Sequence, residues 1–381
     1  MDISLISINS LLIIIFILII IGSIEMQFHL KSIYKIPIRI HVNGTRGKSS
    51  VVRLIAAGLR NSDMKILAKT TGTVPRIINE NGIDINLHRL RSASIGEQIK
   101  LMRFFSKQSP DVMVLECMAV NPQYQWISEH RIVRSTLSVI TNVRKDHIDE
   151  MGITNKDIAS SLSNTIPYNS KLITSEDKYY NIFKSVSNKR NTQIIKTDEK
   201  DVDSDYIENF HYIEHPENIS LALKVCEELG VSKNKALKEM LKVEPDPGAL
   251  LIWNIKNKNQ FVSAFAANDP DSTFKVWSLI KNKFNNNICV FLNTRDDRRY
   301  RTNQLIDLVA NKIKPDLLII RVDNLDIDIP SINVKVFPMK TTQNDVIDYI
   351  VNLENHTILG IGNMVGWGEV FLKQLENNKE C

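Results

Sequence analysis

The sequence predicts an α/β protein with two sheet-containing domains behind one long apolar helix. Three observations predict this fold. Short apolar segments with strand character alternate with helical patterns, which is typical of mostly parallel sheets. Prolines and a glycine interrupt the chain at residues 244–248, and residues 3–24 carry no charged side chain. The 381 residues are enough for two or three domains with a full core.

The apolar N-terminal segment is the first expected element. Its 22 residues would form a helix about 33 Å long, enough to cross the ~30 Å hydrocarbon core of a membrane. A buried core helix is usually shorter and patterned, and a cleaved signal peptide needs a basic start and a small-residue cleavage site. No basic residue precedes the segment, whereas Lys31, Lys35 and Arg39 follow it. We therefore expect a single-span anchor (3–24) at the cell membrane, with the catalytic domains in the cytoplasm.

Eight further segments have the composition of strands. They lie at residues 37–42, 112–115, 136–140, 261–267, 288–292, 317–322, 334–337 and 357–361. Helical patterns lie between them, for example at 49–61, 216–229 and 344–353. Because a helix cannot continue through two prolines and a glycine, we expect a domain boundary at 244–248. The first domain would cover residues 36–246 and the second residues 250–381.

Charge and cysteine content exclude several classes of protein. The chain has 48 Lys and Arg against 43 Asp and Glu, and its net charge of +5 is too mild to indicate nucleic-acid binding. Its four cysteines lie far apart without a CxxC pair, so neither a disulfide framework nor a zinc ribbon is expected. Separate reduced thiols agree with a cytoplasmic location.

The strongest local signal is a phosphate-binding loop at residues 43–50. A strand leads into it and a helical pattern follows, and its sequence is Asn43-Gly44-Thr45-Arg46-Gly47-Lys48-Ser49-Ser50. Glycines let backbone N–H groups surround phosphate oxygens, and the start of the helix adds its positive dipole. Lys48 would reach the β- and γ-phosphates, and the Ser49 hydroxyl would ligate Mg²⁺. Val42 replaces the first glycine of the full GxxxxGK[ST] spacing, and an ordinary strand-to-helix turn is the alternative interpretation.

This loop resembles the ATP loop of the Mur ligase superfamily, which includes the muramyl-peptide ligases and folylpolyglutamate synthase. Other superfamily elements have counterparts in the same order, namely Glu116 after an apolar strand, the Asp-His-Ile-Asp sequence at 146–149, and residues 215–223. Residues 41–49, 69–73, 116–120 and 141–144 resemble most the ligase subunit of poly-γ-glutamate synthases (PgsB/CapB type). The resemblance implies a Mur-ligase-like P-loop ATPase domain with a mostly parallel sheet and a smaller Rossmann-like C-terminal domain.

The resemblance also implies a reaction. An ATP-dependent acid–amino-acid ligase of this kind would phosphorylate a carboxylate, and an amine would attack the acyl phosphate to form a γ-glutamyl amide bond. The implied cofactors are ATP and Mg²⁺, with Lys48, Glu116 and His147 as catalytic residues and Ser49, Glu116 and His147 around the metal. Asn218 would lie at the adenine, although an Asn at this place is often a helix cap. The implied nucleotide contacts are Asn43, Gly44, Thr45, Arg46, Gly47, Lys48, Ser49, Ser50 and Asn218. From the second domain, we expect Arg295 to contact the nucleotide as well.

The second domain departs from the superfamily pattern. Asn268 stands where muramyl ligases have a histidine, and Gly248-Ala249 stands where they have a phosphate-contacting Gly-Arg. Four arginines follow the strand at 288–292, so we expect them at a ligand-facing end of the sheet. We expect the acidic polymer to contact Asn268, Asp271, Arg298, Arg299 and Arg301. The alternative is a solvated loop neutralised by the two Asp residues at 296 and 297.

The expected partners are glutamate, the growing poly-γ-glutamate chain and small membrane subunits of a synthase or export complex, but no nucleic acid. Two other functions stay open. One is another superfamily ligase, of the folylpolyglutamate or muramyl-peptide type, which the anchor and the lack of a nucleotide-sugar domain disfavour. The other is a membrane-tethered P-loop ATPase that drives assembly or export without ligation, and ADP release that depends on glutamate would distinguish it.

Overall fold

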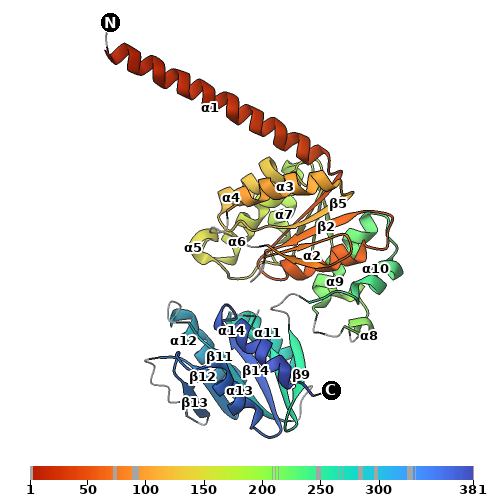
Figure 1. Ribbon diagram of the computed structural model, residues 1–381. Helices are drawn as coiled ribbons and strands as arrows, with labels where there is room; N and C mark the ends of the chain where they lie inside the picture. The colour runs from red at the N-terminus through yellow and green to blue at the C-terminus, as the bar shows by residue number, and fades with distance from the viewer. Residues whose placement is uncertain are drawn as a thin grey trace. The chain divides into compact units, whose positions relative to one another are not determined.

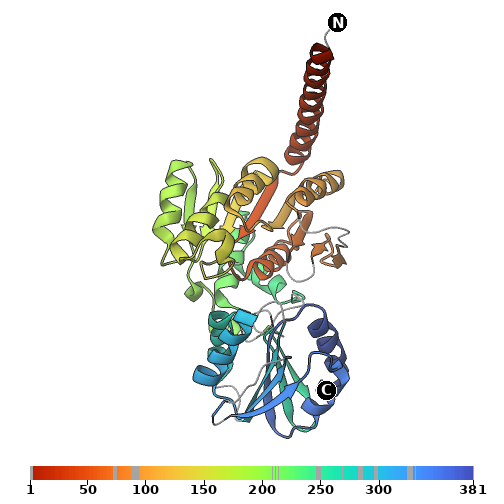
Figure 2. The ribbon, with the colours of Figure 1, turned by 90° about the vertical axis from the view of Figure 1, so that its left-hand side faces the viewer.

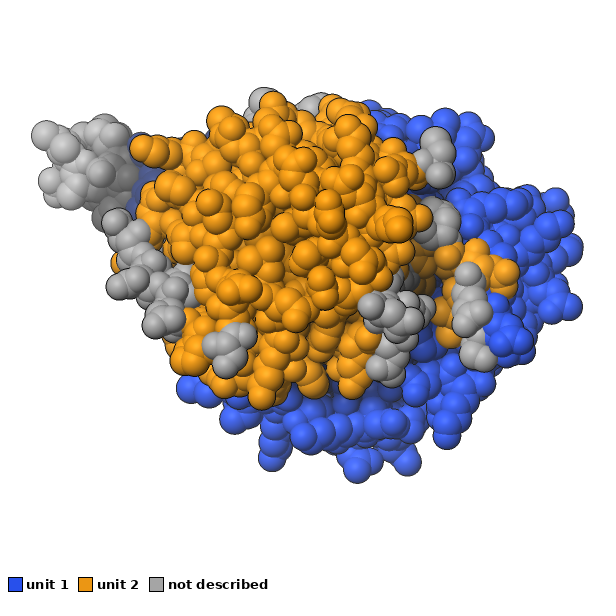
Figure 3. All heavy atoms as spheres, turned by 90° about the horizontal axis from the view of Figure 1, so that it is seen from below, with its two compact units in different colours: residues 1–206, 215–244 blue, residues 207–214, 245–381 orange. Residues whose placement is uncertain are grey.

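Two compact units make up the chain (Figure 3). Unit 1 comprises residues 1–206 and 215–244, and unit 2 comprises residues 207–214 and 245–381. The computed structural model describes residues 3–71, 75–87, 94–207, 209–210, 212, 214–245, 250–265, 267, 269–281, 286–295, 299–323, 329–330 and 332–380. The expected boundary segment at 244–248 lies mostly outside these residues, so the boundary at 246–250 stays a prediction.

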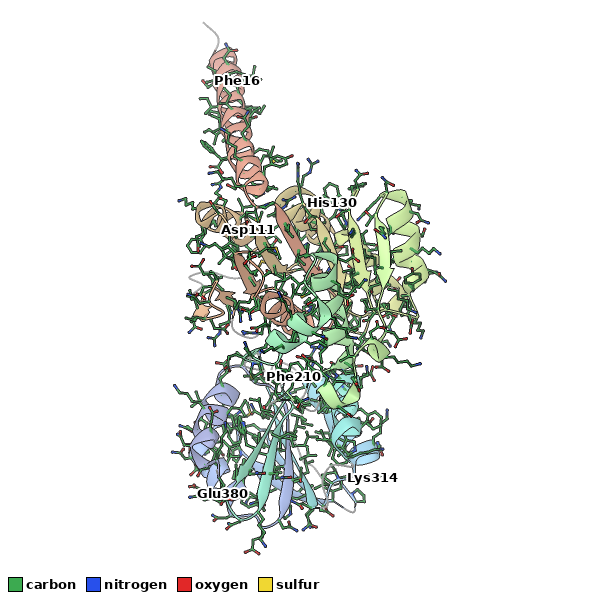
Figure 4. All side chains as sticks on the ribbon, turned by 90° about the vertical axis from the view of Figure 1, so that its right-hand side faces the viewer. Phe16, Asp111, His130, Phe210, Lys314 and Glu380 are labelled. Atoms are coloured by element: carbon green, nitrogen blue, oxygen red, sulfur yellow. The ribbon has the colours of Figure 1, made fainter. Side chains whose placement is uncertain are left out.

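A single long helix, α1 (Ile3–Tyr34), begins the described chain (Figure 1). Its part from Asn9 to Tyr34 is long and apolar enough to cross a membrane, and its most apolar window is not buried in the structure. Figure 4 labels Phe16, one of the exposed apolar residues. The helix continues ten residues beyond the expected end at residue 24, because its last turns pack on unit 1. There His29 and Ile33 are buried, and the His29 imidazole bonds to the carbonyl of Ile132 (3.0 Å).

The sheet of unit 1 has eight strands in the order β4-β3-β2-β5-β1-β6-β7-β8. The six from β2 to β8 in this order run parallel, and β3 and β4 are antiparallel additions at one edge. Central strands such as β1 and β5 are buried along nearly their whole length because helices cover both faces. The bounds are β1 (Ile38–Asn43), β2 (Ile66–Thr70), β3 (Arg76–Ile78), β4 (Asp84–Asn86), β5 (Val112–Glu116), β6 (Leu137–Ile140), β7 (Lys171–Thr174) and β8 (Gln193–Lys196).

Helices cover both faces of this sheet. One face carries α2 (Lys48–Gly58), α9 (Pro216–Glu228) and α10 (Lys233–Met240), which pack on one another. The other face carries the end of α1 with α3 (Gly96–Gln108), α4 (Pro122–Ile127), the π-helix η1 (Ser128–Val133), α6 (Asn155–Leu162) and α7 (Tyr180–Lys189). Short helices at loops and edges are α5 (Ile148–Met151), η2 (Ser163–Thr165), η3 (Glu199–Asp201) and α8 (Ser204–Ile207).

A buried ion pair joins the middle of this sheet to η1. His41 Nδ1 on β1 lies 2.7 Å from Glu129 Oε2, and both side chains are fully buried. The other oxygen of Glu129 accepts hydrogen bonds from the backbone and hydroxyl of Ser135. Burial alone would lower the pKa of His41, but the Cys117 thiol and the Glu129 carboxylate outweigh it and raise the pKa to about 10. Burial would raise the pKa of Glu129, whereas the bonds from His41 and Ser135 hold it below its ordinary value.

Unit 2 has a second sheet, in the order β13-β12-β11-β14-β10-β9, that is parallel except for β9. Along β11, Val290 and Leu292 face one core while Cys289 and Phe291 face the other, so helices cover both faces (Figure 2). The strands are β9 (Leu251–Ile255), β10 (Asn259–Ser263), β11 (Asn287–Asn293), β12 (Leu317–Arg321), β13 (Asn333–Phe337) and β14 (His356–Gly362). The helices are α11 (Pro270–Ile280), α12 (Arg299–Leu308) and η5 (Val309–Ile313) on one face, and α13 (Gln343–Val351) and α14 (Trp367–Leu375), followed by η6 (Glu376–Asn378), on the other.

The expected α/β fold is confirmed, and each of the eight expected strands is present. The segment expected at 261–267 was extended too far, because β10 ends at Ser263 and the amide of Ala267 then bonds to the carbonyl of Ala264 in a turn. Six strands, β2, β3, β4, β7, β8 and β9, are not predicted from the sequence. Most of these are strands of three to five residues in which polar and apolar residues mix.

The His41–Glu129 pair predicts how stability depends on pH. The pKa of His41 is about 10 in the folded chain against an ordinary 6.5, so its contribution is complete below pH 6.5 and lost as pH rises through 10. We expect the free energy of unfolding, measured by urea titration of the full chain in detergent, to fall between pH 7 and 10. In a His41→Gln/Glu129→Gln double variant this part of the slope should disappear.

Other groups also titrate over this pH range, so the informative quantity is the difference between wild type and double variant. Glu129→Ala alone should cost about 3–5 kcal/mol near pH 7, because it leaves a buried imidazolium without its partner. Identical slopes in the wild type and double variant would show that the pair is not charged in the folded chain.

Candidate functional site

The expected site residues of unit 1 gather where several parallel strands end. β1 lies between β5 and β6, with Val42 opposite Glu116 and Asn43 opposite Ile140. The chain leaves β1 through α2 and enters β2, which lies beyond β5. β6 lies on the opposite side of β1. Ligands of open parallel sheets bind at such a switch point, at the carboxyl ends of the strands.

Two glycines shape the loop between β1 and α2. Gly47 is the residue before the first turn of α2 and has a left-handed backbone with φ +81°. A Cβ at this position would lie 2.5 Å from Asn218 Oδ1 of α9. Gly44 has φ +134°, and a Cβ there would lie 2.0 Å from Thr141 Oγ1. The loop therefore requires glycine at both places, for its backbone angle and for the close approach of neighbouring residues.

Asn142, the second residue after β6, holds the loop in place. Its side-chain oxygen accepts hydrogen bonds from the Thr45 hydroxyl (2.8 Å) and from the Arg46 amide (3.1 Å). Its side-chain nitrogen donates to the Arg46 carbonyl (3.0 Å), and Thr141 Oγ1 donates to the same oxygen (2.6 Å). Four bonds from the end of β6 thus determine the backbone path of residues 45 and 46.

Lys48 begins α2 and points back into the loop. Its Nζ donates to the carbonyls of Gly44 (2.7 Å) and Thr45 (3.3 Å). The first turn of α2 continues with Ser49 and Ser50, both half-buried. A cationic side chain, a helix start and a glycine-shaped loop together make a site suited to a phosphate group.

Glu116 ends β5 and faces the same helix start. It is buried, and one carboxylate oxygen accepts a hydrogen bond from Ser49 Oγ (2.8 Å) and one from the amide of Thr71 (2.6 Å). A serine hydroxyl and a carboxylate in contact are the hard oxygen ligands that Mg²⁺ prefers. The donor set therefore fits a magnesium ion that takes its other ligands from phosphates and water.

His147 lies at the same edge, in the loop after β6. It has a left-handed backbone (φ 45°) before α5, and its side chain is 55% exposed. Its ring lies 3.9 Å from Asp146, whose carboxylate is also 3.5 Å from the guanidinium of Arg46. Among the residues that the structure describes, no three His, Cys, Asp or Glu side chains form a ready metal cluster.

A cavity of about 200 Å³ joins these parts. Its lining residues, which come from the ends of β1, β2 and β5 and from the loop after β6, are Asn43, Gly44, Thr45, Lys48, Thr71, Glu116, Cys117, Met118, Ala119, Val120, Asp146, His147 and Met151. The structure thus brings Lys48, Glu116 and His147 to one cavity. Asn43 contributes mainly through its backbone, because its side chain bonds to Gln125 and Thr165.

Asn218 lies on the other side of the loop. It is the third residue of α9, behind Pro216, and the residue that precedes the helix is His215. Asn218 is therefore not the helix cap, and its buried amide touches the loop at Gly47 instead. Nearby, the Arg144 guanidinium lies 3.6 Å from Glu217.

The expected site residues of unit 2 are only partly described. Arg295 and Arg301 line a small pocket of about 40 Å³ at the carboxyl ends of β11 and β14. Arg299 is exposed at the start of α12, and Asp271 is exposed in the first turn of α11. Asn268 and Arg298 lie outside the described residues.

Sequence reasoning missed several residues of the unit 1 site. Asn142 lies in one of the segments that carry the resemblance, but the sequence pattern points only to His147, five residues later. Its role in the site comes from hydrogen bonds to Thr45 and Arg46, which lie 97 and 96 positions away in the sequence. Motif spacing alone does not reveal such contacts. Thr71 and Asp146 were missed for the same reason, since one acts through its backbone amide and the other through Arg46.

Two protein families match the chain. The Mur ligase middle domain matches residues 42–237, and the poly-gamma-glutamate synthase CapB C-terminal domain matches residues 252–378. The first match includes the phosphate loop, Glu116, Asn142 and Asn218. The second match covers most of unit 2, including the arginine-bearing end of its sheet.

Curated relatives match over most of the chain. The PGA synthase CapB of Bacillus subtilis is 33% identical over 381 residues, which cover 95% of this chain and 96% of the relative. The capsule biosynthesis protein CapB of Bacillus anthracis is 38% identical over 312 residues, which cover 79% of this chain and 67% of the relative.

Solved structures with the same fold have low sequence identity to this chain. The folylpolyglutamate synthase of Thermotoga maritima has a TM-score of 0.65 at 16% identity, covering 94% of this chain and 93% of that one. The bifunctional folylpolyglutamate synthase/dihydrofolate synthase of Yersinia pestis, complexed with AMPPNP and Mn ion, has a TM-score of 0.70 at 13% identity, covering 93% and 92%. Another structure of a bifunctional enzyme of this name, with Mn, AMPPNP and L-glutamate bound, has a TM-score of 0.67 at 13% identity, covering 92% and 93%.

These similarities differ in what they show. At 13–16% identity the solved structures show a common fold. The two family matches lie one after the other along the chain, and the Bacillus subtilis relative covers nearly all of it. The chain therefore belongs to the Mur ligase superfamily and, within it, to the CapB family of poly-γ-glutamate synthases.

Proposed function

We propose that this chain is an ATP-dependent ligase that polymerises glutamate through γ-carboxyl amide bonds. The observation that carries the proposal is the pair of family matches, a Mur ligase middle domain that contains the phosphate loop and a CapB C-terminal domain after it. In this reaction ATP phosphorylates the carboxylate, and the amine of the next glutamate displaces phosphate from the acyl phosphate. We assign the nucleotide site to residues 36–246 and polymer binding to residues 250–381.

The loop of unit 1 would bind ATP. The amides of residues 44–50 and the Lys48 ammonium would bind the β- and γ-phosphates, with Arg46 and the first turn of α2 beside them. To reach a phosphate, Lys48 would exchange its bonds to the Gly44 and Thr45 carbonyls for bonds to phosphate oxygens. Asn218 supports the loop from the α9 side and is proposed to face the adenine.

Ser49 and Glu116 would hold Mg²⁺. Their oxygens lie 2.8 Å apart beside the loop, and neither needs to leave its element to share one ion. A bound Mg²⁺ supplies positive charge that neutralises the phosphates during transfer. His147 lines the same cavity. Because an imidazole suits Mg²⁺ less well than oxygen ligands do, we propose that it acts on a second ion or through water.

Unit 2 would bind the acidic polymer. Poly-γ-glutamate carries one free carboxylate per residue, and Arg side chains bind carboxylates in a bidentate manner. Arg295 and Arg301 line one pocket at the carboxyl edge of the sheet, and Arg299 is exposed beside it. We propose that these three, with Arg298, Asn268 and Asp271 of the flanking segments, contact the chain, and that Arg295 also contacts the nucleotide.

A folylpolyglutamate ligase is the second candidate, because solved enzymes of that type share the fold. Those enzymes also attach glutamate, so the fold does not separate the two functions. The C-terminal match to CapB favours the polymer. Glutamate-dependent ADP release without added folate would distinguish the two.

We further propose that α1 anchors the enzyme in the cell membrane, with the catalytic units in the cytoplasm. The helix is long and apolar enough, and basic residues follow rather than precede the span. Small membrane subunits that assist synthesis and export are the partners that we propose.

Lys48→Ala should abolish ligation. Loss of the ammonium removes positive charge from the phosphates where transfer occurs, so we expect glutamate-dependent ADP release to fall by at least about 100-fold. The assay uses the full chain in detergent with ATP, Mg²⁺ and glutamate. Lys184→Ala, an exposed lysine on α7, is the matched control and should retain activity.

Polymer yield and membrane recovery of the Lys48→Ala variant should be measured together. We expect no polymer and unchanged recovery in membranes, since α1 is intact. Unaltered polymer yield would exclude this loop as the ATP site. Phosphate release that is equal with and without glutamate in the wild type would favour an ATPase without ligase activity.

Glu116→Gln should raise the Mg²⁺ requirement. The amide keeps the size of the side chain but removes the charge that would bind the ion, so we expect the half-saturating Mg²⁺ concentration to rise about 10- to 100-fold. Glu199→Gln, an exposed carboxylate on η3, is the control. An unchanged Mg²⁺ dependence in Glu116→Gln would remove Glu116 from the proposed metal site.

Asn142→Ala should weaken ATP binding with little effect on folding. Three hydrogen bonds to Thr45 and Arg46 are lost, so the loop no longer keeps one path, and we expect the KM for ATP to rise about 10- to 100-fold. Asn188→Ala, on the exposed face of α7, tests the effect of removing an amide elsewhere. If the KM for ATP stays at the wild-type value, the hydrogen bonds of the Asn142 side chain do not contribute to nucleotide binding.

A further inference from the structure

The edge of the unit 1 sheet that lies opposite the phosphate loop carries its own set of exposed side chains. At this amino edge α1 ends at Tyr34 and β1 begins at Ile38. Figure 4 labels Asp111, just before β5, and His130 in η1, and both lie at the side of unit 1 where α1 enters. The edge therefore adjoins the helix that is proposed to cross the membrane.

The last turns of α1 have two different faces. Residues 29 and 33 are buried against unit 1. Ile24, Phe28 and Lys31 form an exposed stripe at helical spacing, in which Phe28 is 57% exposed and the Lys31 ammonium lies 6.0 Å from its ring centroid. The exposed Lys35 follows directly after the helix. An apolar span thus passes directly into a stripe of aromatic and basic residues.

A second stripe of the same composition lies on α3. Lys100, Phe104 and Lys107 are exposed and are spaced by four and three residues, so they share one face of the helix. Phe104 is 50% exposed. Arg103, next to it, forms an ion pair with Glu25 of α1, at the point where the charge-free segment ends. This ion pair holds the α3 stripe beside residue 25 of α1.

The same edge continues around η1 and the start of β7. The exposed Arg131 lies over the ring of Trp126 (5.6 Å), and Tyr168, which is 55% exposed, lies beneath the Arg190 guanidinium (5.3 Å). We define the amino-edge surface as Phe28, Lys31, Lys35, Lys100, Phe104, Lys107, Arg131 and Tyr168. It has five cations, and the nearby Asp111 carboxylate already accepts a bond from the Lys65 amide.

We propose that the amino-edge surface binds the anionic phospholipid headgroups of the leaflet from which α1 emerges. Lysine and arginine attract such headgroups, while phenylalanine and tyrosine rings enter the interface between headgroups and acyl chains. The surface complements that leaflet in charge and is continuous with the span through α1. The inference rests on the proposed membrane anchoring, and it adds that unit 1 itself lies against the bilayer with its phosphate loop facing away.

The test measures the depth of two labelled sites in the full chain. Phe104→Cys reports on the amino edge, and Ile153→Cys, 76% exposed after β6, reports on the opposite edge. Both variants carry Cys381→Ser, because the other three cysteines are buried. Each is labelled with a fluorophore and reconstituted into vesicles of phosphatidylglycerol and phosphatidylcholine that contain a nitroxide-headgroup lipid.

We expect quenching at residue 104 to exceed that at residue 153 by at least about twofold. Lys100→Glu/Lys107→Glu, and vesicles of phosphatidylcholine alone, should reduce the quenching at 104 to the level at 153. Lys156→Glu/Lys178→Glu reverses two exposed lysines at the other edge and should leave the difference intact. Equal quenching at both sites in the anionic vesicles would overturn the proposal. Quenching at 104 that is the same in anionic vesicles and in phosphatidylcholine vesicles would also overturn it.

Two further measurements separate this inference from the proposals on which it rests. Retention of the chain in vesicles after alkaline carbonate extraction shows that α1 is inserted, and its release would overturn both the anchor and the lipid contact. Glutamate-dependent ADP release in detergent tests the ligase without any bilayer. Retention and ligation together with equal quenching would disprove the lipid contact alone.

Discussion

The register of β1 between β5 and β6 determines the whole candidate site of unit 1. Val42 lies opposite Glu116 and Asn43 opposite Ile140. The chain therefore turns into α2 between the Glu116 carboxylate at the end of β5 and Asn142 after β6. A shift by one residue would turn each side chain to the other face of the sheet. Glu116 would then leave Ser49, and Asn142 would leave the loop.

The two faces of these strands have separate tasks. On one face Glu116 bonds to Ser49 of α2, and on the other face His41 of β1 forms a buried ion pair with Glu129 of η1. The first contact is polar and open to the cavity, and the second is enclosed. An enclosed ion pair tolerates little change in distance. It therefore helps to hold β1 and η1 at a constant spacing beneath a loop whose backbone path must be kept.

The sequence was informative where chemistry follows from neighbouring residues. Gly47, Lys48 and Ser49 are adjacent, and Glu116 follows an apolar strand, so the loop and one metal ligand could be predicted. Contacts between residues far apart in the sequence could not be predicted. Asn142 reaches the loop across 97 positions and His41 reaches Glu129 across 88, and nothing local marks either partner. The short strands β7 and β8 were missed because four residues with mixed polarity carry little periodic signal.

The continuity of α1 with unit 1 has a consequence for the product. β1 has six residues, so the phosphate loop begins about 20 Å along the sheet from the end of α1. Under the proposed anchoring, each new amide bond forms on the side of the domain that faces the cytoplasm. The finished polymer would therefore start its passage to the exterior from the far side of its own synthase. A partner that exports it would have to reach around the domain or collect the chain after release.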